Sequence, residues 1–135
     1  MRKIFIATSS ALLLLVSPGR GQPQGAFRAN MTCERMDAPG RMRCEVEARV
    51  GSSETIATGD VIIVRTPRFV MALRGRIGPN EATTREAELW RWAFALAAQE
   101  KGIGDIEATA RLIVCRGGTC EPRQAHVQAR VVVGQ

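Results

Sequence analysis

Tyrosine is absent from this chain of 135 residues, histidine occurs once, and the other large aromatic side chains are two tryptophans and four phenylalanines. The one histidine, His126, cannot complete a Cys/His metal site, because the cysteines are spaced for bridges. The serines Ser52 and Ser53 lie in an expected loop, so a serine–histidine–acid triad would need one specific long-range contact. We therefore expect a protein without enzyme chemistry, a metal ion or a cofactor.

Long apolar runs are also missing, since none reaches the roughly 18 residues of a membrane-spanning helix. No stretch combines low hydrophobicity with an excess of charge, as disordered segments do. Hydrophobic residues make up 45% of the chain and charged residues 24%. This composition is typical of one ordinary globular domain and excludes a multidomain enzyme.

The N-terminal region has the pattern of an export signal: a basic start, an apolar stretch and small residues at the cleavage site. These features are Arg2 and Lys3, residues 4–16, and Gly19 and Gly21. We expect a signal peptide over residues 1–21 and a single β-rich domain over residues 22–135. The product is then periplasmic or extracellular, and we expect no stable membrane insertion once the signal is removed.

Removal of residues 1–21 takes away three basic residues and no acidic residue, so the formal net charge falls from +6 to +3. This charge is too small to indicate nucleic acid, which an exported protein rarely meets. We expect the partner to be an anionic polymer or another protein.

Four cysteines in an exported domain of this size indicate two disulfides, for which three pairings are possible. The turn chemistry selects one of them. Gly117 and Gly118 have the composition of a two-residue hairpin turn, and folding the chain about them sets Cys115 opposite Cys120. The two cysteines then form a non-hydrogen-bonded pair, in which Cα atoms about 4.5 Å apart are within disulfide range.

Extending this register sorts apolar residues onto one face of the hairpin and polar residues onto the other. The apolar pairs are Ala110 with Ala125, Ala108 with Val127 and Ile106 with Ala129. The same test applied to the turn cluster at residues 37–40 pairs Cys33 with Cys44, and the apolar pairs that follow are Met31 with Val46 and Ala29 with Ala48. We expect the bridges Cys33–Cys44 and Cys115–Cys120.

The two bridges are not expected to be equivalent. Cys33 and Cys44 continue the apolar face of their hairpin, which predicts a buried and inert bridge. Cys115 and Cys120 share a face with polar residues beside a glycine turn, which predicts an exposed and more easily reduced bridge. Loop closure stabilises the fold by about 3 kcal/mol for the longer loop and about 2 kcal/mol for the shorter one.

Two further strands are expected between the hairpins. Residues 60–65 and 69–77 are rich in valine, isoleucine and leucine and flank a Thr-Pro pair, so we expect them to form adjacent strands.

A helix is expected next. Thr83 and Glu86 have capping-box spacing, and Gly102 is placed to end a helix after Lys101. Residues 89–98 are apolar apart from one arginine, which predicts burial around most of the helix. The aromatic residues Trp90, Trp92 and Phe94 are either a ligand pocket or the core, and the core is favoured because the domain has few other large residues.

These segments predict a mainly β fold of about six strands. The expected architecture is an immunoglobulin-like β-sandwich with one inserted buried helix, and the alternative is a two-layer α+β fold.

A concentration of arginines crosses the middle strands. Arg65, Arg68, Arg74 and Arg76 are candidates for an anion-binding site. A solvated strand face is the simpler interpretation of the same residues.

The segment 106–122, which contains Cys115, the glycine turn, Cys120 and Pro122, resembles the end of the N-terminal immunoglobulin-like domain of periplasmic thiol:disulfide interchange proteins of the DsbD type. In that family the two cysteines of this hairpin form the redox-active pair, and a proline follows the second. The resemblance implies that Cys115 and Cys120 exchange disulfides with partner proteins.

Three functions therefore compete. The first is an exported non-catalytic binding or structural module held by two disulfides. The second is a thiol–disulfide exchange module that uses Cys115 and Cys120. The third is an inhibitor of an exported enzyme that presents the bridge-locked loop 116–119.

Overall fold

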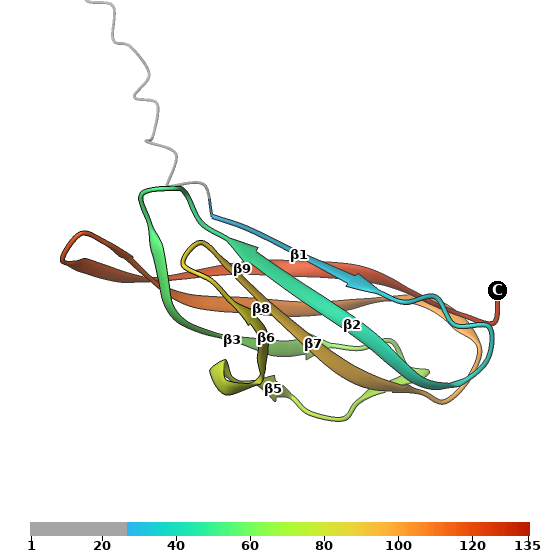
Figure 1. Ribbon diagram of the computed structural model, residues 1–135. Coiled ribbons are helices and arrows are strands. Elements are labelled where there is room, and N and C mark those ends of the chain that lie inside the picture. The colour runs from blue at the N-terminus through green and yellow to red at the C-terminus, as the bar shows by residue number, and fades with distance from the viewer. Residues whose placement is uncertain (1–26) are drawn as a thin grey trace, which may run out of the picture.

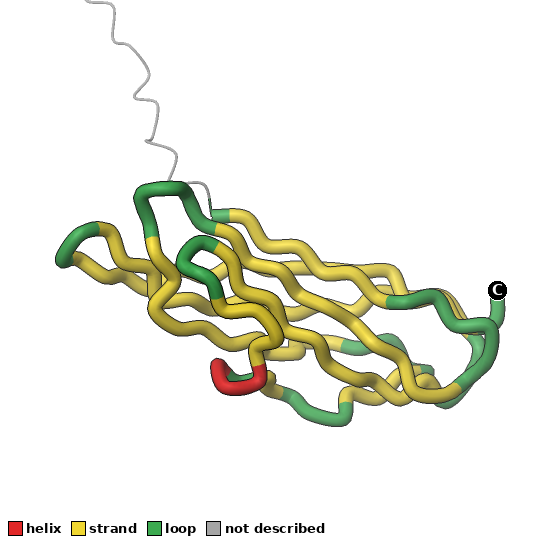
Figure 2. Tube along the Cα trace, in the orientation of Figure 1, coloured by secondary structure: helices red, strands yellow, loops and turns green. Residues whose placement is uncertain are grey.

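Residues 27–135, which are the residues that the structure describes, form a sandwich of two antiparallel β-sheets in the computed structural model of the protein. Figure 1 shows the two layers, and Figure 2 shows that strands make up most of the described chain. The expected signal peptide over residues 1–21 lies outside the described residues.

The first sheet, called sheet A, has the strand order β1-β2-β7-β4, and a further strand, β6, pairs with β7. Its strands are β1 (Arg28–Cys33), β2 (Gly40–Arg49), β4 (Val70–Ala72), β6 (Ala82–Arg85) and β7 (Leu89–Ala98). The second sheet, called sheet B, has the order β5-β3-β8-β9. Its strands are β3 (Thr55–Arg65), β5 (Arg76–Ile77), β8 (Gly102–Arg116) and β9 (Thr119–Val133).

Each long strand places its large apolar residues between the sheets, because side chains alternate between the two faces of a strand. Along β8 the even-numbered residues from Ile106 to Val114 are all buried. Trp92 from sheet A is fully buried. The core therefore lies between the sheets, and every second residue of the long strands is left to form the outer faces.

Both predicted hairpins and both disulfides are confirmed. Cys33 pairs with Cys44 in the register of β1 with β2, and Cys115 pairs with Cys120 in that of β8 with β9. The predicted apolar pairs occur in the same registers. Gly117 has a φ of 57°, a left-handed conformation that favours glycine in this turn. The turn of the β8–β9 hairpin lies at the end of the sandwich opposite the C-terminus (Figure 1).

The predicted helix after residue 83 is wrong, and with it the α+β alternative. Among the described residues the one helical element is a 3-10 turn, η1 (Pro79–Glu81). The segment instead forms β6 and β7, and Gly102 begins β8 rather than ending a helix. A largely apolar run can form either a buried helix or a buried strand. Here the segment forms a strand, because its backbone pairs with β2, β4 and β6.

The alternation within β7 shows why this segment forms a strand. The residues that point into the core are Trp90, Trp92, Phe94, Leu96 and Ala98, whereas three alanines and Arg91 occupy the outer positions. Large and small side chains therefore alternate along β7 with the period of two that is typical of a strand, although the alanine content alone favours a helix. The core role expected of the aromatic residues is confirmed, since Trp90 and Trp92 are buried with ring centroids 5.7 Å apart.

The strand expected over residues 69–77 is divided between the two sheets. Val70–Ala72 forms β4 against β7, whereas Arg76–Ile77 forms β5 against β3. The expected adjacency to residues 60–65 is therefore correct for β5 only.

Candidate functional site

The outer face of sheet B brings charged side chains together from strands that are distant in sequence. Asp60 on β3 lies opposite Arg111 on β8, and Arg111 lies opposite Gln124 on β9. Arg76 on the short edge strand β5 completes the group. Four strands thus contribute one side chain each to the same region.

Two guanidinium groups hold the carboxylate of Asp60. Arg111 donates from Nε to Oδ1 at 2.8 Å and from Nη2 to Oδ2 at 2.5 Å. Arg76 donates from Nε to Oδ2 at 2.7 Å. The Asp60 side chain is 8% exposed, whereas those of Arg76 and Arg111 are 60% and 50% exposed. The carboxylate is therefore buried beneath two arginines that still reach solvent.

The hydrogen bonds from Arg111 are the largest influence on the pKa of Asp60 and lower it. Burial opposes this shift, and the hydrogen bond from Arg76 adds to it. The same pairing raises the pKa of Arg111. Asp60 and Arg111 are therefore both charged at neutral pH.

A groove of about 600 Å³ lies over this cluster. Its lining includes the residues Asp60, Arg76, Arg111, Ile113, Pro122 and Gln124. The volume falls within the range of roughly 300–1,000 Å³ that is usual for small-molecule sites. We take this groove as the candidate functional site.

The disulfide Cys115–Cys120 lies beside the groove on the same outer face of sheet B. Ile113 and Pro122, which line the groove, form the outward-facing pair next to the two cysteines. Cys115 is half-buried and Cys120 is exposed, so the expected exposure of this bridge is found.

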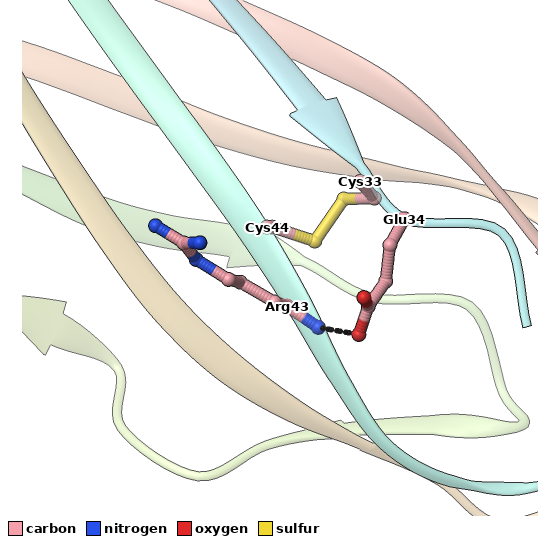
Figure 3. Close-up of a disulfide and its surroundings, with 4 residues drawn as sticks. All are labelled: Cys33, Glu34, Arg43 and Cys44. Carbon is pink, nitrogen blue, oxygen red and sulfur yellow. Dashed lines mark hydrogen bonds between the residues drawn. A yellow bond between two sulfur atoms is a disulfide. The ribbon is translucent and has the colours of Figure 1, made fainter.

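The disulfide Cys33–Cys44 joins β1 to β2 on the other sheet. Cys44 is 1% exposed and belongs to the core, and Cys33 packs against it partly buried. Figure 3 shows that the side chain of Glu34 accepts a hydrogen bond from the backbone N–H of Arg43, at 2.7 Å, next to the bridge. This bridge is enclosed, as expected.

A second charged pair lies between the sheets. Arg123 on β9 donates from Nη2 to the carboxylates of Glu54 and Glu121. The Glu54 side chain is fully buried and that of Arg123 is 13% exposed. The hydrogen bond from Arg123 lowers the pKa of Glu54, although burial acts in the opposite direction. This pair ties the turn before β3 to the β8–β9 hairpin.

The structure does not gather the four predicted anion-binding arginines into one site. Arg65 pairs with Glu107 at 3.9 Å, and Arg74 pairs with Glu81 at 2.6 Å. Arg68 lies exposed between β3 and β4. Of the four, Arg76 lines the groove.

Sequence reasoning missed Asp60 and Arg111 as site residues. An aspartate within a strand of valine and isoleucine is a usable signal, because a buried carboxylate needs partners. Its partner Arg111 is 51 residues away, and no local pattern indicates that β3 pairs with β8.

Within residues 27–135, no group of three or more histidine, cysteine, aspartate or glutamate side chains is placed to hold a metal ion. His126 instead lies 3.0 Å from Thr109, measured between Nδ1 and Oγ1. None of the helices in the described part of the chain is long and apolar enough to cross a membrane.

No protein-family model and no curated protein sequence matches this chain. Similar solved structures are known. One comes from work on fibronectin binding and biofilm formation by the AAF fimbriae of enteroaggregative Escherischia coli. It has a TM-score of 0.40 and 10% sequence identity, and the match covers 80% of this chain and 99% of that one.

Two other structures show a similar likeness. The bacterial hydrophobin BslA has a TM-score of 0.35 and 9% identity, with 78% of this chain and 92% of that chain covered. Self-complemented MyfA, the major subunit of the Myf fimbriae of Yersinia enterocolitica, has a TM-score of 0.31 and 12% identity, with 78% and 99% covered. None of the three is a thiol:disulfide interchange protein. At these scores the likeness carries no functional information, so the function must be argued from the site.

Proposed function

We propose that the mature chain is an exported, non-enzymatic binding module of the immunoglobulin type that binds anionic groups in the groove on sheet B. The strand orders β1-β2-β7 and β3-β8-β9 support this type, because they correspond to the A-B-E and C-F-G strands of immunoglobulin-like sheets. Two disulfides support export to the periplasm or the extracellular space, since disulfides persist in oxidising compartments.

The observation that carries the binding function is the arrangement of Arg76 and Arg111 around Asp60. A buried carboxylate fixes both guanidinium groups, so little side-chain freedom remains to be lost when a ligand binds. Both side chains are still at least half exposed in a groove. A guanidinium is well suited to bind a carboxylate or phosphate through two parallel hydrogen bonds.

Retention on immobilised polyglutamate, eluted with rising sodium chloride, tests this function. We expect R76Q and R111Q to elute at lower salt than the parent. R74Q is the matched control, because it removes the same charge from the same part of the chain but lies outside the groove lining. The melting temperature of each variant checks folding. If R74Q lowers retention as much as R76Q does, the binding reflects net charge alone and the groove has no such role.

Thiol–disulfide exchange is the second candidate function. It is favoured by one observation: the exposed bridge Cys115–Cys120 adjoins a groove that could hold part of a partner. Incubation with a reduced partner thiol, followed by trapping of mixed disulfides, tests this candidate. A mixed disulfide through Cys120 would support thiol–disulfide exchange. If the bridge Cys115–Cys120 stays oxidised, this candidate function is rejected.

A further inference from the structure

Most hydrogen-bond donors of the two groove arginines remain free for a ligand. A guanidinium has five N–H groups. Asp60 engages one N–H of Arg76 and one on each of two nitrogens of Arg111. Each arginine therefore keeps at least three N–H groups, and the exposure of both side chains leaves these groups accessible.

The charge of the groove matches a ligand with one negative charge. Arg76 and Arg111 carry two positive charges, and Asp60 neutralises one of them. Arg123 also lines the groove, but the buried carboxylate of Glu54 compensates its charge, and Glu121, whose side chain is 61% exposed, is not part of the groove lining. One positive charge is thus left uncompensated, and a dianion would exceed it.

An apolar surface lies in the same groove as these donors. Ile113 and Pro122 face each other across β8 and β9, and both line the groove. Ile113 follows Arg111 by two positions and so lies on the same face of the strand. The groove therefore offers cationic donors and an apolar pair side by side.

From this placement we infer that the groove recognises a ligand that carries a single carboxylate beside an apolar group. This inference rests on the binding function proposed above and specifies its ligand. The carboxylate binds to the free N–H groups of Arg76 and Arg111, and the apolar group packs on Ile113 and Pro122. A polypeptide supplies this chemistry either at a C-terminal residue with an apolar side chain or through a glutamate two positions from a leucine.

Calorimetric titration of the mature protein with short peptides tests the inference. The first probe is acetyl-Ala-Ala-Leu with a free carboxylate, compared with the same peptide as its C-terminal amide. The second is acetyl-Leu-Ala-Glu amide, compared with its glutamine counterpart. We expect one or both carboxylate peptides to bind at least about tenfold more tightly than the uncharged partner, because a charge-assisted hydrogen bond is lost in the partner. Which probe binds identifies the source of the carboxylate.

The variant R76Q should weaken binding of the carboxylate peptide several-fold, whereas R74Q should bind it like the parent. R76Q is preferred to R111Q, since Arg111 still holds Asp60 through two hydrogen bonds. Equal affinity for charged and uncharged peptides, equal losses in R76Q and R74Q, or no binding at millimolar concentration would each overturn the inference. Retention on polyglutamate that depends on Arg76, without peptide binding, would overturn the ligand class and leave the proposed function standing. If neither retention on polyglutamate nor peptide binding depends on Arg76, both the ligand class and the proposed function are overturned.

Discussion

Arg123 donates a hydrogen bond to Glu54, which lies 69 residues earlier in the chain and whose side chain is fully buried. The pair joins the turn between β2 and β3 to the strand β9. Removing one member of a buried pair leaves the other charge without its partner, which costs more than the pair itself contributes.

The variant R123M should lower the free energy of unfolding by about 3–5 kcal/mol, the usual cost of removing one partner of a buried ion pair. Replacing both members, in E54M/R123M, should cost less than the sum of the two single variants. Urea unfolding at pH 7 measures each value. R130M is the matched control on the same strand, because the exposed pair of Arg130 with Asp105 should contribute less than about 1 kcal/mol. If the loss of unfolding free energy in E54M/R123M equals the sum of the losses in the two single variants, Glu54 and Arg123 do not stabilise each other.

Stability should fall as the pH is lowered through the acidic range. Hydrogen bonds from arginines hold the pKa of Asp60 below its ordinary value of 3.8, and those of Glu47 and Glu54 below 4.5. The unfolded chain therefore takes up these protons at a higher pH than the folded chain does. The stabilisation is complete above the ordinary values and is lost as the pH falls through the folded values.

The midpoint of urea unfolding, measured from about pH 6 down to about pH 2, checks this expectation. The variant D60N should show a shallower decline than the parent, because it lacks one of the groups that carry the effect. An unchanged slope in D60N would show that Asp60 does not contribute.

Gly102 should not tolerate a side chain. A Cβ at this position would lie 2.8 Å from the ring of Phe69, which packs on the start of β8. We expect G102A to destabilise the fold by about 1–3 kcal/mol, as overpacking does. Gly118 in the hairpin turn has no atom within 4 Å of the corresponding position, so G118A is the control. Thermal unfolding compares the two, and equal melting temperatures would argue against the packing of Phe69.

The two disulfides should open at different potentials. In glutathione buffers we expect Cys115–Cys120 to be reduced at a milder potential than Cys33–Cys44, because exposed disulfides have higher reduction potentials than enclosed ones, and Cys120 is exposed while Cys44 lies in the core. Alkylation of free thiols and mass spectrometry identify the open bridge. Simultaneous opening of both bridges would contradict the difference in exposure.

The two hairpins could be predicted from the sequence because their contacts are local. A glycine turn fixes the register of Cys115 with Cys120 across five residues, and the alternation on each side confirms it. The segment 89–98 was misleading because its outer positions are mostly alanine, which has a high helix propensity. Pairing with β2 and with β4 overrides that propensity.

The groove could not be predicted in the same way. Arg76 was a candidate from the arginine content of its segment, whereas Asp60 and Arg111 have significance only because β3 lies beside β8. Nothing in the local sequence separates Arg76 from Arg74, and the difference arises because their carboxylate partners lie on different elements.

The most direct test of anion binding by the groove is a ¹H–¹⁵N NMR titration of the protein with a short glutamate oligomer. The side-chain Nε–H signals of Arg76 and Arg111 should shift in a saturable manner, together with the backbone signals of Ile113 and Gln124. Those of Arg74 and Arg65 should stay in place. Shifts spread equally over all four arginines, or no shift at Arg76 and Arg111, would contradict the account.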